Sequence, residues 1–267
     1  MHKIIPLLLV FSLVFLSGCV GQTGVGGPGV QITSFSFSDS STVGGSAVYL
    51  TLEVENKGGF KAGNVAAELR GLPDSIWRIA EGRSRSLGEL CGVSSDMTQG
   101  CYQTMTWTLT PTDLPVDQSY EANVKVSYGY QTSYVATIRA QSLQDKRDHP
   151  NRQTGIINPK SSAGPITMTA RLPTTLFTGA TIPVYFDIQN NGGGFVDGDA
   201  LTFNPQGGLS CTNPQVQLRK GISGILVCQL STGGATDFVE SSITLSTGYR
   251  YSVESVSSVT VKAKPPI

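Results

Sequence analysis

The fold is decided by the stretch VYLTLEVENKGGF at residues 48–60. Its first part alternates apolar side chains at Val48, Leu50, Leu52 and Val54 with mostly polar ones. A period of two residues predicts a β-strand with one buried face, because an amphipathic helix would show a period near 3.6. The Asn-x-Gly-Gly sequence that follows predicts the turn that ends this strand.

The same alternation recurs along the chain, in residues 104–109, 120–126 and 182–189. Charged residues make up only 14% of the sequence, glycine contributes 31 residues, and long helical heptads are absent. Strands with one apolar face need a second sheet to cover that face. The sequence therefore predicts an all-β fold built from antiparallel β-sandwiches.

Two segments of the chain are repeated in the same order. Residues 54–64 match residues 188–199 with one inserted glycine, sharing apolar-x-Asn-x-Gly-Gly and then Phe-x-x-Gly-Asn/Asp. Residues 120–130 match residues 239–249 without a gap. Such repetition indicates an internal duplication.

The repeats predict two tandem Ig-like sandwiches, each near the usual size of about 100 residues. We expect domain 1 over residues 30–141 and domain 2 over residues 164–264. The segment 142–163 is polar and rich in turn-forming residues, so we expect it to be a linker or an exposed long connection; the alternative, given its length, is that it wraps a domain edge.

The N-terminus carries an apolar run over residues 4–16 that ends in LSGC, residues 16–19. The run is shorter than the roughly 20 residues of a membrane-spanning helix. It resembles the signal and lipobox of bacterial and archaeal lipoproteins. The resemblance implies that residues 1–18 are a signal peptide and that Cys19 receives a diacylglycerol anchor. Residues 19–29 are rich in glycine, which predicts a flexible tether. The alternative is an ordinary secretory signal that is cut nearby.

The other four cysteines fall in two groups, Cys91 with Cys101 and Cys211 with Cys228. Four cysteines allow three pairings. The economical one is a disulfide within each domain, which an exported location permits. The alternative is a four-thiolate zinc site, but neither pair has the short spacing of a zinc knuckle.

A second resemblance concerns the repeated strand and loop. The stretch YLTLEVENKGG at residues 49–59, followed by AAEL at residues 66–69, is similar to part of CARDB-type and related Ig-like domains of archaeal and bacterial surface proteins. Residues 184–203 are similar too. The resemblance implies an extracellular binding or spacer module and identifies no functional residue.

The sequence offers little for catalysis. His2 lies in the signal, which leaves His149 for any Ser–His or Cys–His mechanism or histidine metal site. We assign no catalytic residue, no cofactor and no metal site. Asp197 and Asp199 could donate oxygens to Ca²⁺, but no EF-hand spacing follows, and we favour a turn.

Five tyrosines near the predicted strand ends form a candidate binding patch: Tyr128, Tyr130, Tyr134, Tyr249 and Tyr251. Tyrosine is common in binding surfaces because it offers a large apolar ring and a polar hydroxyl. The alternative is that these rings pack at the rim of the sandwiches.

We therefore expect a lipid-anchored cell-surface protein, attached to the membrane through Cys19 and facing the extracellular or periplasmic side. Its expected role is non-catalytic, in adhesion or in binding an envelope protein or surface polymer. A formal net charge of zero gives no case for nucleic acid. The alternative is a subunit of a surface filament or S-layer-associated assembly joined by strand addition, which predicts an unpaired strand edge. A solute-binding lipoprotein or an enzyme fits less well, because amphipathic helices are absent.

Overall fold

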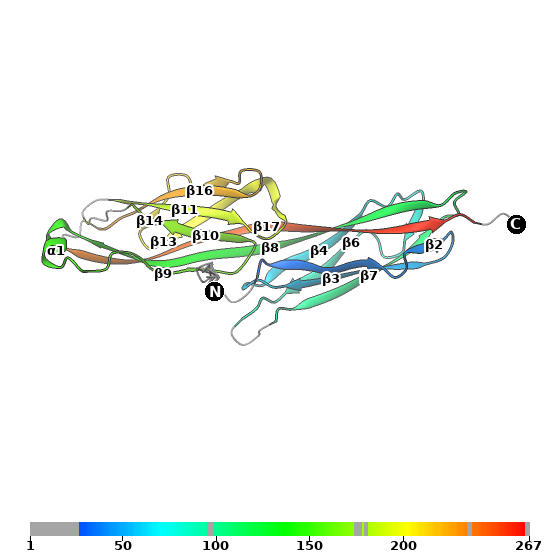
Figure 1. The fold of residues 1–267 in the computed structure, drawn as a ribbon, viewed down its shortest axis with the longest axis horizontal. Helices are drawn as coiled ribbons and strands as arrows, with labels where there is room; N and C mark the ends of the chain where they lie inside the picture. Colours follow the sequence, from blue (N-terminus) through cyan, green and yellow to red (C-terminus); the bar gives the residue numbers. More distant parts are fainter. Residues whose placement is uncertain (1–26, 95–98, 174–177, 179–180, 234–236, 265–267) are drawn as a thin grey trace, which may run out of the picture.

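The computed structural model describes residues 27–94, 99–173, 178, 181–233 and 237–264. Nearly all of its secondary structure is strand, and the molecule is a long rod (Figure 1). This confirms the predicted all-β class and its antiparallel sandwiches. Cys19 and the expected signal peptide lie outside the described residues.

Two four-stranded antiparallel sheets form the outer layers of the two sandwiches. The first has the order β1-β3-β7-β5, and the second has the order β10-β11-β16-β14. The first sheet consists of β1 Val30–Phe37, β3 Val48–Asn56, β7 Tyr102–Pro111 and β5 Trp77–Ile79. The second consists of β10 Ile166–Arg171, β11 Ile182–Asn190, β16 Ser223–Leu230 and β14 Leu209–Ser210.

Both sandwiches share a third sheet, with the order β15-β13-β17-β8-β4-β6. β12 and β2 also pair with β17, β2 in the parallel sense, and β9 pairs with β8. The members are β15 Gln215–Gln217, β13 Ala200–Gln206, β17 Phe238–Lys262, β8 Gln118–Gln141, β4 Ala62–Arg70, β6 Ser84–Leu90, β12 Phe195–Val196, β2 Ser41–Val43 and β9 Gly155–Ser161.

The centre of the shared sheet is a ribbon of two long strands, β8 and β17. They pair without a register shift from Phe238 opposite Gln141 to Val261 opposite Gln118. At about 3.3 Å per residue such a ribbon spans about 80 Å. The first four-stranded sheet covers one half of the ribbon and the second covers the other half (Figure 1).

The ribbon keeps one buried face along its whole length. In β8 the even-numbered residues are buried in both halves, for example Val124 and Val126 in the first and Ala136 and Ile138 in the second. Strands twist along their length. This twist explains why the two covering sheets lie on opposite sides of the ribbon in Figure 1 although they cover the same face.

A pseudo-two-fold relation connects the two sandwiches. The hydroxyl of Tyr128 accepts from the first residue of β1, and the hydroxyl of Tyr249 accepts from the first residue of β10. The offset between these tyrosines is 121 residues, and the same offset carries Gly129 onto Arg250. Gly129 and Arg250 are paired in the ribbon, so the axis passes between them. The ungapped sequence match, with its offset of 119, is therefore two residues out of structural register.

The segment expected as a linker, residues 142–163, contains secondary structure. Ser142 caps the short helix α1, Leu143–Asp148, by accepting from the backbone N–H of Asp145. β9 then pairs with β8 beside residues 134–139. The segment turns the chain at the end of the rod (Figure 1). The expected division after residue 141 also needs correction, because β8 and β17 each contribute to both sandwiches.

Candidate functional site

Four of the five candidate tyrosines surround the pseudo-two-fold axis. Tyr128 lies opposite Tyr251, and Tyr130 lies opposite Tyr249, on either side of the central Gly129–Arg250 pair. Neighbouring rings are in contact, with centroids 5.8 Å apart for Tyr128 and Tyr251 and 6.3 Å apart for Tyr130 and Tyr249. We call these four residues the tyrosine junction.

The tyrosine junction is not a binding patch. Tyr128 and Tyr251 are fully buried, Tyr130 is buried, and Tyr249 is half-buried. Tyr134 is also buried, and it packs edge-to-face on Phe186 inside the second sandwich. The candidate patch predicted from the sequence is therefore wrong, because the ribbon continues through these residues and both sandwiches cover them.

Burial also changes the acid–base properties of these tyrosines. Loss of hydration disfavours the phenolate. It raises the pKa of Tyr130 and of Tyr134 to about 12, and it raises the pKa of Tyr128, Tyr249 and Tyr251 above the ordinary value. The hydroxyls therefore remain neutral hydrogen-bonding groups at neutral pH.

The repeated Asn-x-Gly-Gly motif fastens each sandwich to the tyrosine junction. In the first copy, the Asn56 amide donates to the carbonyl of Phe60 at 2.8 Å and accepts from the N–H of Gly58. The N–H of Phe60 then donates to the hydroxyl of Tyr130 at 3.0 Å. The asparagine closes the loop, and the closed loop bonds to the ribbon.

The second copy has the same arrangement. The Asn190 amide donates to the carbonyl of Gly194 at 2.9 Å and accepts from the N–H of Gly192. The N–H of Gly194 donates to the hydroxyl of Tyr251, which itself donates to Asn190 at 2.6 Å. The sequence repeat was visible without the structure, but its role in joining the sandwiches was not.

Asp197 and Asp199 lie in a turn at the 3-10 helix η1, Asp197–Asp199. The Asp197 carboxylate is 3.4 Å from the Arg250 guanidinium, and Asp199 has a left-handed backbone with φ 53°. Asn64, its counterpart in the first copy, has φ 50°. The turn interpretation is supported, and no cluster of three or more metal-ligating side chains occurs within the described residues.

His149 belongs to a small polar cluster next to α1. Its Nδ1 lies 2.9 Å from the carboxylate of Asp145, which is buried and also accepts from Arg152 at 2.6 Å. Arg152 lies over the ring of Phe238. These contacts hold the end of the rod together.

The two predicted disulfides are present, Cys91–Cys101 and Cys211–Cys228. The first adjoins the closed loop of the first sandwich, since the N–H of Asn56 donates to the carbonyl of Cys101. The second ties β16 to the residue after β14. Disulfides persist in oxidising compartments, which indicates an extracellular or periplasmic location. In the part of the chain that the structure describes, no helix is long and apolar enough to cross a membrane.

The described chain begins at the middle of the rod. The N–H of Val30 donates to the hydroxyl of Tyr128, one residue from the pseudo-two-fold axis. Just before it, Gly29 accepts a backbone hydrogen bond from Lys57. The blue start of β1 lies near the centre of Figure 1. A segment that precedes Gly27 is therefore attached to the waist of the rod and not to either end.

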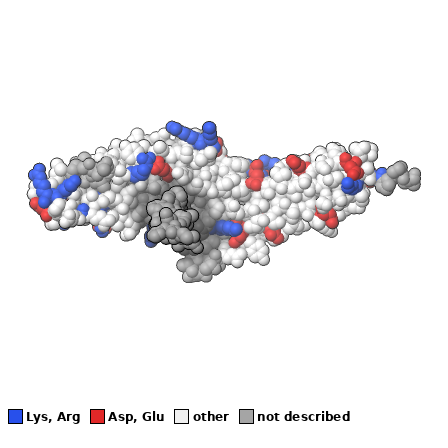
Figure 2. Space-filling view, viewed as in Figure 1, with Lys and Arg blue, Asp and Glu red and all other residues white. Residues whose placement is uncertain are grey.

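Charge is distributed sparsely over the body. Figure 2 shows acidic and basic side chains scattered singly or in small groups, with wide uncharged areas between them. Several of these charges are paired, such as Lys61 with Glu89 and Lys262 with Asp117. The face in view shows no continuous basic stripe that would follow a nucleic-acid backbone.

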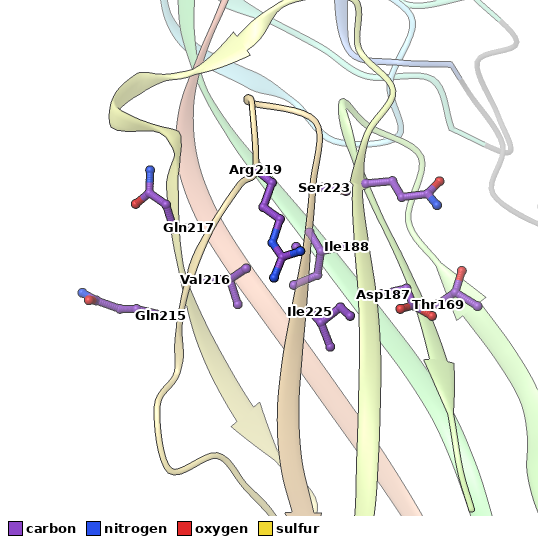
Figure 3. Close-up of a pocket in the computed structure, with 11 residues that line it drawn as sticks. Thr169, Asp187, Ile188, Gln215, Val216, Gln217, Arg219, Ser223 and Ile225 are labelled. Atoms are coloured by element: carbon purple, nitrogen blue, oxygen red, sulfur yellow. The ribbon is translucent and has the colours of Figure 1, made fainter.

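A shallow groove of about 580 Å³ lies on the second sandwich, beside β15 and across the outer face of β10, β11 and β16 (Figure 3). Val216 and Arg219 form one side of it, and Ile225 of β16 and Asp187 of β11 form the other. Figure 3 shows the Arg219 side chain extending into the groove between β15 and β16. Sequence reasoning missed this groove, because its residues are far apart in the chain and carry no motif.

No family model matches the chain, and no curated protein matches it. Among solved structures, a type II cohesin dyad from the adaptor ScaA scaffoldin of Acetivibrio cellulolyticus has 9% identity and a TM-score of 0.20, covering 80% of this chain and 83% of that one. The collagen adhesin of S. aureus has 12% identity and a TM-score of 0.15, covering 87% of this chain and 92% of that one.

Proposed function

We propose that this chain is a lipid-anchored, non-catalytic surface protein whose rigid rod is held at its waist by the lipid on Cys19. The observation that carries the proposal is the position of Val30 beside the tyrosine junction, at the centre of an unbroken ribbon. Each sandwich is then a free arm that can bind a protein or surface polymer. The two disulfides support the extracytoplasmic location that this role needs.

The length of the tether limits how the rod can stand. Cys19 lies eight residues before Gly27, and eight extended residues reach at most about 28 Å. Half of the ribbon measures about 40 Å. An upright rod would need its waist about 40 Å above the membrane, beyond the reach of the tether. The rod therefore lies along the membrane, with its axis within about 45° of the surface.

Anchoring is tested first, by following the wild-type chain and Cys19→Ala through membrane fractionation. We expect the wild type in the membrane fraction and Cys19→Ala in the soluble exported fraction. Equal retention of both in the membrane fraction would overturn the lipid anchor.

The orientation is tested by neutron reflectometry of the lipidated protein on a supported bilayer. We expect a protein layer thinner than the length of the rod. A matched variant with about 20 Gly/Ser residues inserted before Gly27 should give a thicker and more diffuse layer, because the longer tether releases the waist. A wild-type layer as thick as the full rod would contradict attachment at the waist.

A further inference from the structure

The outer faces of the two four-stranded sheets carry different side chains at equivalent positions. Counting back five residues from Asn56 and from Asn190 reaches Thr51 and Tyr185. Thr51 lies opposite Thr106, and their hydroxyl groups are 3.3 Å apart. The first sandwich therefore presents hydroxyl groups where the second presents Tyr185.

The same difference extends to the neighbouring strand. Tyr185 lies opposite Val227, and Asp187 lies opposite Ile225. The counterparts of Val227 and Ile225 are Thr106 and Thr104, opposite Thr51 and Glu53. Ile225 is 59% exposed, Val227 is 48% exposed and Tyr185 is 37% exposed. We call these three residues the apolar face of the second sandwich.

The apolar face borders a strand edge that lacks a partner in the described residues. β14 pairs with β16 at Leu230 and Gln229, and the backbone N–H of Arg219 donates to the carbonyl of Ser223. Alternate residues of a strand direct their backbone groups to the same edge. The backbone groups of Ile225 and Val227, which lie between these two contacts, therefore point to the open edge.

In the first sandwich the corresponding edge is covered. The N–H of Thr108 donates to the carboxylate of Glu81, and the carbonyl of Thr106 accepts from the Arg85 guanidinium at 2.6 Å. The counterpart of Thr106 is Val227, and on this strand the groove adjoins the edge at Ile225. The open strand edge is therefore specific to the second sandwich and does not follow from the fold that the two sandwiches share.

A positive charge lies beside this open edge. Arg219 extends into the groove and forms no ion pair among the residues that the structure describes (Figure 3). The Asp187 carboxylate, which lines the groove, is held by Arg171. A guanidinium forms strong, often bidentate, charge-assisted hydrogen bonds with a carboxylate, which is the anionic group that a peptide can supply.

We propose that the open edge of β16 binds an extended peptide that combines apolar side chains with a carboxylate. Its backbone pairs with Ile225 and Val227, its outward apolar side chains extend the apolar face, and its carboxylate bonds to Arg219. Strand addition of this kind obtains affinity from backbone hydrogen bonds and specificity from alternate side chains. The proposal gives a partner to the binding role proposed above, but it does not depend on the lipid anchor.

A second copy of the chain fits the edge poorly. Two β16 edges pairing around Leu226 would bring Ser223 of each copy opposite Gln229 of the other, and Gln229 is already paired with Ser210 of β14. The available window is therefore short, which suits a peptide segment better than an antiparallel pair of β16 strands.

The test uses the exported Cys19→Ala chain, which separates peptide binding from anchoring, and a phage-displayed library of random peptides. We expect selected peptides with alternating apolar residues and a Glu or Asp. Their binding should slow the hydrogen exchange of the Ile225 and Val227 amides. Synthetic versions should bind at least tenfold more weakly to the triple variant Tyr185→Thr, Ile225→Thr, Val227→Thr. That variant carries the threonines of the first sandwich, so it is matched to a surface that this fold already tolerates.

Charge reversal provides an independent measurement. Arg219→Glu should weaken the selected acidic peptides at least tenfold and should favour peptides with Lys or Arg when the selection is repeated. Equal binding to wild type and triple variant, protection of amides elsewhere, or failure to enrich any peptide would overturn the proposal. A wild-type dimer that dissociates in the triple variant would also overturn it, by assigning the apolar face to self-association.

Discussion

The two sandwiches agree where they meet and differ where they face solvent. At the waist, each has an asparagine that closes a glycine loop and a ribbon tyrosine that binds that loop, Asn56 with Tyr130 and Asn190 with Tyr251. On the outer sheets, hydroxyl groups in one sandwich correspond to the apolar face in the other. The fold requires the first set of residues and not the second, so the outer faces are where the two halves could acquire separate roles.

Alkaline pH is expected to have the largest effect, because it acts at once on the five ribbon tyrosines whose pKa is raised by burial. The pKa of Tyr130 and Tyr134 is about 12 in the folded protein, against about 10 for an unfolded tyrosine. As the pH rises, the unfolded state therefore loses these protons first. The contribution of the tyrosines to the free energy of unfolding is fully present below pH 10 and is lost progressively between pH 10 and pH 12. At pH 11 the loss is about 1.4 kcal/mol for each such tyrosine. Urea denaturation at several pH values measures this loss of stability, and tyrosinate absorbance measures the ionisation of the tyrosines. Tyrosinate signal from all the tyrosines at pH 10.5 without unfolding would contradict a buried junction.

The loop asparagines provide a direct comparison of the two halves. Asn56→Ala removes two donated hydrogen bonds and one accepted one from a fully buried site, at a cost of about 3 kcal/mol. Asn190→Ala removes two donated and two accepted hydrogen bonds, one of them from the Tyr251 hydroxyl, but from a half-buried site, at about 2 kcal/mol. Urea denaturation gives both values. The exposed neighbour Asn191 is the control: its side chain makes one exposed hydrogen bond, to Thr167, and Asn191→Ala should cost less than about 1 kcal/mol. A negligible effect of either loop variant would break the proposed equivalence.

The smallest effect is expected on the outer faces. The double variant Thr51→Tyr, Thr106→Val places side chains of the second sandwich on the first, and its stability should change by less than about 0.5 kcal/mol. Thermal denaturation measures the change. If the exchange unfolds the protein, the fold depends on these outer-face residues as well as on the residues of the waist, which would contradict the difference between the two regions.

The sequence predicted strands well and connectivity poorly. Period-two patterns identified β3, β7 and β11, because each buries one face. The continuity of β8 was missed, since Gly129 and the following polar residues suggested a strand end. The structure shows instead that every second residue remains buried from Tyr120 to Ala140.

The position of the tyrosines could not be predicted for a related reason. Side-chain alternation shows that Tyr128 and Tyr130 share a face, but not what covers that face. The cover comes from loops about 70 residues before Tyr130 and about 60 before Tyr251, through Phe60 and Gly194. The groove beside Arg219 was equally hidden, because it depends on how far β14 extends along β16.

The central claim is that the shared ribbon makes one structural unit of the two sandwiches, and Phe186→Ala tests it most directly. Phe186 is fully buried in the second sandwich, and its removal should cost about 3–4 kcal/mol. The two tryptophans of the chain, Trp77 and Trp107, are both buried in the first sandwich. We predict one urea transition, shifted equally in tryptophan fluorescence and in far-UV circular dichroism. An unshifted fluorescence transition with a biphasic dichroism curve would show that the sandwiches unfold separately and would contradict the account.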